Sequence, residues 1–305
     1  MKCIIIKLDL FYIGGTNKME SYDNLKAGEK GAWLSIITYI ILSFFKLVIG
    51  YFGNSEALLA DGLNNSTDVI ASIAVLVGLK IARKPPDNNH QYGHYRAETI
   101  ASLIAAFIMV TVGIQVIVEG VKSLATAGNN IPDLFTGWVA LASSLIMFFV
   151  YLYNINLAKK IKSSSVKAAA KDNLSDALVS IGAFIGIIGS RFGFHWLDTV
   201  TAIIVGLIII KTAIEIFKDS ALELTDGFET DELEAIEKTV KKNPNIEKVK
   251  SLKARTHGNQ TFVDIVIVTD QNLNVFESHQ ITEEIENSLL EKHQIQNVHI
   301  HIEPR

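Results

Sequence analysis

Six apolar segments constrain the fold of this chain more than any other feature of its sequence. Each is about 20 residues long, the length that a helix needs to cross the roughly 30 Å hydrocarbon layer of a bilayer. Hydrophobic residues make up 49% of the 305 residues and charged residues only 20%, which is more apolar than a soluble domain of this size usually is. The sequence therefore predicts a six-helix transmembrane domain within residues 31–218, over the segments 31–52, 57–82, 97–121, 135–157, 166–190 and 196–217.

Basic residues in the loops assign the two sides of the membrane. They flank alternate crossings, and the positive-inside rule then places both termini in the cytoplasm of a multi-pass cell-membrane protein in contact with lipid. These residues are Lys26, Lys30, Arg83, Lys84, Arg96, Lys159, Lys160, Lys162 and Lys167. Residues 1–30 are expected to form a cytoplasmic leader. Within it, residues 1–18 are expected to be disordered or to precede a working start at Met19, because their apolar run is too short and too interrupted for a signal peptide.

The last part of the chain, residues 219–305, has the charge pattern of a soluble domain. The segment "TDELEAIEKTVKKN" has helical spacing, with Thr230 as its expected N-cap. The segments "VKSLKART" and "TFVDIVIVTD" alternate as strands across a "HGNQ" turn, and a helix over 276–291 and a strand "NVHIHIEP" follow. This α-β-β-α-β order predicts a small sheet covered by helices on one face.

Two pairs of polar residues lie inside apolar segments, and they raise the question of function. Asn64 and Asp68 are four residues apart, as are Asp172 and Asp176, so each pair stacks on one face of its helix. A charged carboxylate in hydrocarbon costs about 2.5 to 3.5 kcal/mol on insertion scales unless it binds a cation or a proton. Two facing pairs would form a cage that binds a cation and protons in turn.

Other polar residues in these segments have simpler explanations. Asn65, Ser66 and Ser175 are of the kind that form hydrogen bonds between helices in membrane bundles, and this alternative remains open for the two pairs as well. Asp61 lies one turn before the first pair and either supports the site or lies at the helix entrance. Lys46 is expected to pair with an acid or to extend its ammonium to the membrane surface.

Several classes of function are disfavoured by composition. The one cysteine, Cys3, permits neither a disulfide framework nor a cysteine metal site. A net charge of -4 argues against nucleic acid as a partner. No nucleophile with a neighbouring base stands out, so we do not expect an enzyme.

Together these features resemble the cation diffusion facilitator family of divalent-metal efflux transporters. The similarity rests on "SEALLADGLNNSTDVIAS" in the second segment, "DNNHQYGHYRAE" before the third, the acidic pair in the fifth and the C-terminal α-β-β-α-β order. The resemblance implies a homodimer of six-helix protomers with ferredoxin-like cytoplasmic domains. It also implies export of a divalent cation in exchange for protons by alternating access.

By position, the resemblance implies a transport site of Asn64, Asp68, Asp172 and Asp176. All four donors are oxygen atoms, whereas the zinc branch of the family often has histidine at one of these places. Oxygen donors suit Mn²⁺ better than Zn²⁺, and the combination resembles the manganese branch. We therefore expect Mn²⁺ as the substrate, with no cofactor, and Zn²⁺, Fe²⁺ or Co²⁺ export as alternatives. The alternative from another class is a membrane metal sensor or scaffold, in which the polar residues only set helix packing.

Two further metal sites follow from the same resemblance. Asp87, His90 and His94 match a second position at the cytoplasmic mouth of some members; otherwise the two histidines brace the loop. A regulatory divalent-metal site in the C-terminal domain would use His279, His301 and Glu303. Lys250 and Val266 occupy two other positions of that regulatory site, so a complete binuclear site is not expected there.

Overall fold

The structure is a computed structural model that describes residues 2–53, 55–125, 133–194 and 196–305. The chain forms two compact units, one of Tyr22–Ser220 and one that includes Ala221–Arg305.

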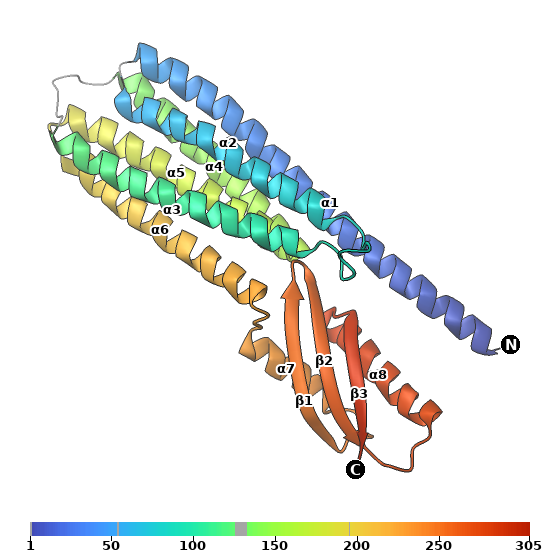
Figure 1. Ribbon diagram of the computed structural model, residues 1–305. Helices are drawn as coiled ribbons and strands as arrows, with labels where there is room; N and C mark the ends of the chain where they lie inside the picture. Colours follow the sequence, from blue (N-terminus) through green and yellow to red (C-terminus); the bar gives the residue numbers. More distant parts are fainter. Residues whose placement is uncertain (1, 54, 126–132, 195) are drawn as a thin grey trace. The chain divides into compact units, whose positions relative to one another are not determined.

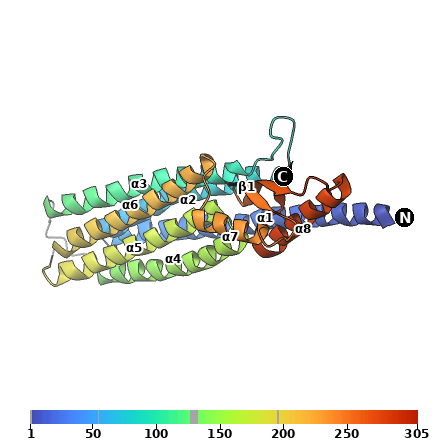
Figure 2. The ribbon, with the colours of Figure 1, turned by 90° about the horizontal axis from the view of Figure 1, so that it is seen from below.

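Long helices make up the membrane unit and run side by side (Figure 1 and Figure 2). Over the described residues they are α1 (Lys2–Phe52), α2 (Glu56–Ala82), α3 (Arg96–Ala125), α4 (Leu134–Ile161), α5 (Ser164–Arg191) and α6 (Trp196–Leu224). Within the described part of the chain, α1 to α5 each contain a segment long and apolar enough to cross a membrane, and α6 has 29 residues. The predicted six-helix fold is therefore confirmed.

Local signals in the sequence set the helix ends. Ser55 caps α2 by accepting a hydrogen bond from the backbone N–H of Leu58, and the adjacent prolines 85 and 86 follow three residues after its end. Asp133 caps α4 in the same way. Residues 2–18 are helical and not disordered, because α1 runs without interruption from Lys2 and its sequence contains no proline that would break it.

Small residues let the membrane helices approach closely. At Gly78 of α2, an added Cβ would lie 3.0 Å from the carbonyl oxygen of Ala97 on α3. At Gly206 of α6, an added Cβ would lie 2.8 Å from the carbonyl oxygen of Gly113 on α3. Such contacts between small residues are a main source of helix association in lipid. Large apolar side chains such as Phe44 and Phe149 point outward, with 63% and 66% of their surface exposed, as expected for lipid-facing positions.

A three-stranded sheet with helices on one face forms the C-terminal unit (Figure 1). Its elements are α7 (Thr230–Val240), β1 (Lys248–His257), β2 (Gln260–Thr269), α8 (Val275–His293) and β3 (Asn297–Pro304). The strand order is β1-β2-β3, with β1 antiparallel and β3 parallel to β2. Buried Val263, Ile265 and Ile267 of β2 pack with apolar residues of α7 and α8. The predicted α-β-β-α-β domain is confirmed. Thr230, however, is the first helical residue and Glu229 is the N-cap.

Candidate metal centre

Three carboxylates meet inside the membrane unit. Asp68 comes from α2, and Asp172 and Asp176 come from α5, one helical turn apart. All three are buried, with 1%, 6% and 2% of their surface exposed. Each offers one carboxylate oxygen, and these three oxygen atoms lie within 4.8 Å of one another. So dense a cluster of acids in an apolar environment requires a cation or protons to offset its charge.

Asn64 completes the predicted set of four. Its amide nitrogen donates to Oδ2 of Asp68 at 3.1 Å and to Oδ1 of Asp176 at 3.2 Å. The two ends of an amide are assigned from their hydrogen-bond partners, and rotation by 180° exchanges them. Asn64 can therefore donate to the carboxylates or, after rotation, direct its oxygen towards a cation between them. The structure brings together all four residues that the sequence predicted.

Tyr39 of α1 belongs to the same cluster, although sequence reasoning missed it. Its hydroxyl donates to Oδ2 of Asp176 and lies 3.2 Å from Oδ2 of Asp172. Its side chain is fully buried. A tyrosine in an apolar helix usually signals packing or the membrane interface. Only the fold, which joins positions 133 residues apart, reveals this role.

A second polar cluster involves the buried lysine of α1. The ammonium of Lys46 lies 2.8 Å from Oδ2 of Asp61 and donates to Oδ1 of Asn65 at 2.5 Å and to Oγ of Ser180 at 3.0 Å. The Lys46 side chain is 0% exposed, so the expected pairing with an acid is confirmed and extension to the membrane surface is wrong. Nδ2 of Asn65 in turn lies 3.5 Å from Oδ2 of Asp68. Asn65 therefore connects the Lys46–Asp61 ion pair to the carboxylate cluster.

The two predicted packing serines differ. Ser66 lies 2.6 Å from Ser43 of α1, which is the expected bond between helices. The bond of Ser175 goes to the carbonyl of Lys171 within its own helix.

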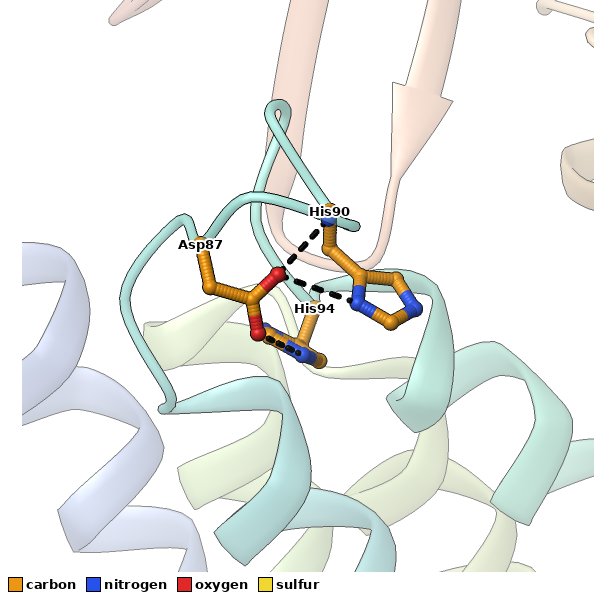
Figure 3. A group of neighbouring side chains, drawn as sticks. All are labelled: Asp87, His90 and His94. Carbon is orange, nitrogen blue, oxygen red and sulfur yellow. Dashed lines mark hydrogen bonds and ion pairs between the residues drawn. The ribbon is translucent and has the colours of Figure 1, made fainter.

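The loop between α2 and α3 gathers a smaller group, Asp87, His90 and His94 (Figure 3). Oδ1 of Asp87 lies 3.3 Å from Nδ1 of His90, and Oδ2 lies 3.4 Å from Nε2 of His94. The backbone N–H groups of His90 and Asn89 donate to Oδ1 at 2.7 and 2.9 Å. These bonds, that of His90 first, hold the pKa of the exposed Asp87 below its usual value. One carboxylate and two imidazoles within reach of one another are a workable ligand set for a divalent cation.

The three residues predicted for a regulatory site, His279, His301 and Glu303, do not form a group of candidate ligands in the described part of this chain. His279 of α8 is exposed and lies 3.4 Å from Glu283 on the same helix. Glu303 of β3 pairs with the ammonium of Lys250 at 2.6 Å, and His301 is exposed opposite Val266. Within the described residues of this single chain, the groups of three or more candidate ligands are the two already described, and these residues are in neither. The regulatory site stays a prediction.

Comparison with known proteins agrees with this architecture. The family described as "Cation efflux transmembrane domain" matches residues 32–225, and that described as "Cation efflux protein, cytoplasmic domain" matches residues 228–305. The chain is 52% identical to the manganese efflux system protein MneS of Bacillus subtilis, over 94% of this chain and 99% of the relative. It is 32% identical to the manganese efflux system protein MneP of the same organism, over 90% and 96%. It is 26% identical to the magnetosome protein MamM of Magnetospirillum gryphiswaldense, over 90% and 87%.

These matches cover both units, and the chain belongs to the cation efflux family. It is thus a multi-pass membrane protein of a transporter family, with a C-terminal domain of the family's cytoplasmic type.

Proposed function

We propose that the protein exports Mn²⁺ from the cytoplasm in exchange for protons, by alternating access to a site formed by Asn64, Asp68, Asp172 and Asp176. The observation that carries this proposal is the buried cluster of three carboxylates and one amide between α2 and α5. In a protein of this family, a buried polar cluster between the membrane helices is the expected place for a transported ion.

The donor atoms favour manganese over zinc. All four residues offer oxygen, and no histidine lies among them. Hard oxygen ligands suit Mn²⁺, whereas Zn²⁺ favours nitrogen and sulfur in a tetrahedral arrangement. Two relatives that cover nearly the same length, MneS and MneP, carry the description manganese efflux. Export of Zn²⁺, Fe²⁺ or Co²⁺ is the alternative within the family.

Proton exchange follows from the same carboxylates. An oxygen that binds the cation must be deprotonated, so metal binding releases protons and protonation releases the metal. On the cytoplasmic side, the cation displaces protons from the aspartates. On the other side, protons moving down their gradient neutralise the aspartates and expel the cation. The fluxes are coupled because one set of oxygen atoms serves both ions.

The other parts have supporting roles in this proposal. The loop group of Asp87, His90 and His94 binds a divalent cation at the cytoplasmic mouth. Both termini lie in the cytoplasm, and the protein acts as a homodimer, which the matched cytoplasmic domain supports. The sensor or scaffold alternative is less favoured, since the relatives named above include efflux proteins.

Metal uptake into proteoliposomes tests the proposal. The purified protein is reconstituted, a pH gradient is imposed, and Mn²⁺ or Zn²⁺ is added outside. We expect gradient-driven Mn²⁺ flux that is lost in Asp172→Asn and retained in the control Asp219→Asn, whose half-exposed carboxylate forms a surface pair with Lys167. Zinc flux without manganese flux would retain the transporter and exclude manganese. No flux of any metal, in folded protein, would favour the sensor or scaffold.

A further inference from the structure

Tyr39 reaches the carboxylate cluster from a third helix. Asn64 and Asp68 lie on α2 and the other two acids on α5, whereas Tyr39 lies on α1. Its ring packs in a buried group with Leu42, Met147 and Ala177, and its hydroxyl touches Asp172 and Asp176. The ring is thus fixed by packing on one side while its oxygen points into the site.

Hydrogen bonds around Asn173 determine which way the Tyr39 hydroxyl is oriented. Oδ1 of Asn173 accepts from Oγ of Ser35 at 3.1 Å and from Nδ2 of Asn154 at 2.9 Å. With the amide in this orientation, its Nδ2 donates to the Tyr39 oxygen at 2.9 Å. The Tyr39 oxygen therefore accepts one hydrogen bond, and its own proton is directed to a carboxylate. A hydroxyl has two acceptor lone pairs, so one remains available to a cation.

We propose that the Tyr39 hydroxyl oxygen is a fifth protein ligand of the transported cation and that it favours Mn²⁺ over Zn²⁺. The proposal rests on the proposed function of this site. The Tyr39 oxygen and Oδ2 of Asp172 are 3.2 Å apart. Neighbouring oxygens of an octahedral site with metal–oxygen bonds of about 2.1 Å are roughly 3 Å apart. The two atoms already have the spacing of adjacent ligands.

Coordination number is the reason for the selectivity. Zn²⁺ is satisfied by four ligands in a tetrahedron, a number that Asn64 and the three aspartates already supply. Mn²⁺ suits octahedral oxygen sites, so a fifth oxygen contributes to its binding but adds little for Zn²⁺. The hydroxyl keeps its proton and binds as a neutral phenol. A bound Mn²⁺ then ties α1 to α2 and α5.

Metal binding to Tyr39→Phe tests this role, since the substitution removes only the hydroxyl. We would use full-length protein in which His90→Ala and His94→Ala remove the loop group, and identify the intramembrane site by loss of binding in Asp172→Asn. Mn²⁺ binding is measured by electron paramagnetic resonance and Zn²⁺ binding by competition. We expect Mn²⁺ affinity to fall by at least about tenfold, the lower end of the loss seen when even a hydrogen-bond partner of a metal ligand is removed. Zn²⁺ affinity should fall much less, and this difference between the two metals distinguishes a ligand from a residue that only positions the acids.

A matched control and the contrary outcomes complete the test. Tyr153→Phe removes a hydroxyl from an exposed position of α4 and should bind both metals like the parent. An equal loss for both metals would show that Tyr39 only positions the acids and would overturn the proposal, as would unchanged affinities. If the parent binds Mn²⁺ but transports none, the proposed function fails. The losses of Mn²⁺ and Zn²⁺ affinity in Tyr39→Phe then still show whether the Tyr39 oxygen is a metal ligand. A parent that binds no Mn²⁺ overturns both.

Discussion

Removal of the buried ammonium of Lys46 should destabilise the membrane unit severely. The side chains of Lys46 and Asp61 are 0% and 1% exposed, and the ammonium uses all three of its N–H donors, on Asp61, Asn65 and Ser180. In Lys46→Met, Oδ2 of Asp61 keeps only the hydrogen bond from Ser180, and its Oδ1 already has no hydrogen-bond partner among the described residues. A buried charge left without its partner costs about 3–5 kcal/mol.

The double variant Lys46→Met/Asp61→Leu should cost less than Lys46→Met alone. Replacing both members of a buried ion pair by apolar residues is often neutral. What remains is the loss of the donor to Oδ1 of Asn65 and of both partners of the buried Ser180 hydroxyl, Lys46 and Asp61. Each buried polar group left unsatisfied costs about 1–3 kcal/mol. The two substitutions are therefore strongly non-additive, and their coupling measures the ion pair itself.

Thermal unfolding of the purified protein in detergent measures both effects. For 150–250 residues, 1 kcal/mol shifts Tm by roughly 2–4 °C. Lys46→Met should thus lower Tm by roughly 6–20 °C, and the double variant should unfold at a higher temperature than the single. The reasoning is refuted if Lys46→Met unfolds within about 2 °C of the parent, or if the effects of Lys46→Met and Asp61→Leu simply add.

Two further predictions concern packing and charge. Gly206→Ala places a Cβ 2.8 Å from the carbonyl oxygen of Gly113 and should cost about 1–3 kcal/mol through overpacking. In Gly137→Ala, the matched control, the nearest contact is 3.4 Å, and Tm in the same thermal scan should not fall. A lowered pKa means that Asp87 stabilises its loop above its ordinary pKa and loses this effect only as the pH falls through the lowered value. The pH midpoint of the carboxyl carbon shift of Asp87 in NMR spectra should therefore lie below that of an ordinary aspartate, and a midpoint at or above the ordinary value would contradict the hydrogen-bond geometry.

The parts of the site that the sequence predicted are those encoded by local spacing. Local spacing identifies the pairs Asn64 with Asp68 and Asp172 with Asp176, because residues four apart lie on one helix face. Ionised carboxylates are also costly in the hydrocarbon layer, so their presence there indicates a function. Their meeting depends on contact between α2 and α5, which the family resemblance supplied. The C-terminal strands were predictable because alternation of apolar residues marks a half-buried strand.

Other features depend on tertiary contacts that no local pattern carries. Tyr39 resembles any buried aromatic residue until the fold places Asp176 beside it. Lys46 could be assigned to a paired role or to a surface role, and only the burial of its ammonium between Asp61 and Ser180 decides between them. The cap of α7 fell on Glu229 instead of Thr230, since helix boundaries vary by one or two residues even with good signals.

The pairing of Lys46 with Asp61 also has an electrical consequence. These two charges cancel, so the acids Asp68, Asp172 and Asp176 carry the whole uncompensated charge of the site, three negative charges when all are ionised. A divalent cation neutralises two of them, whereas three protons neutralise all three. A cycle that used every carboxylate would exchange one divalent cation outward for three protons inward. It would then move one net positive charge into the cell, which is worth about 2.3 kcal/mol per 100 mV, and a membrane potential negative inside would drive export together with the pH gradient.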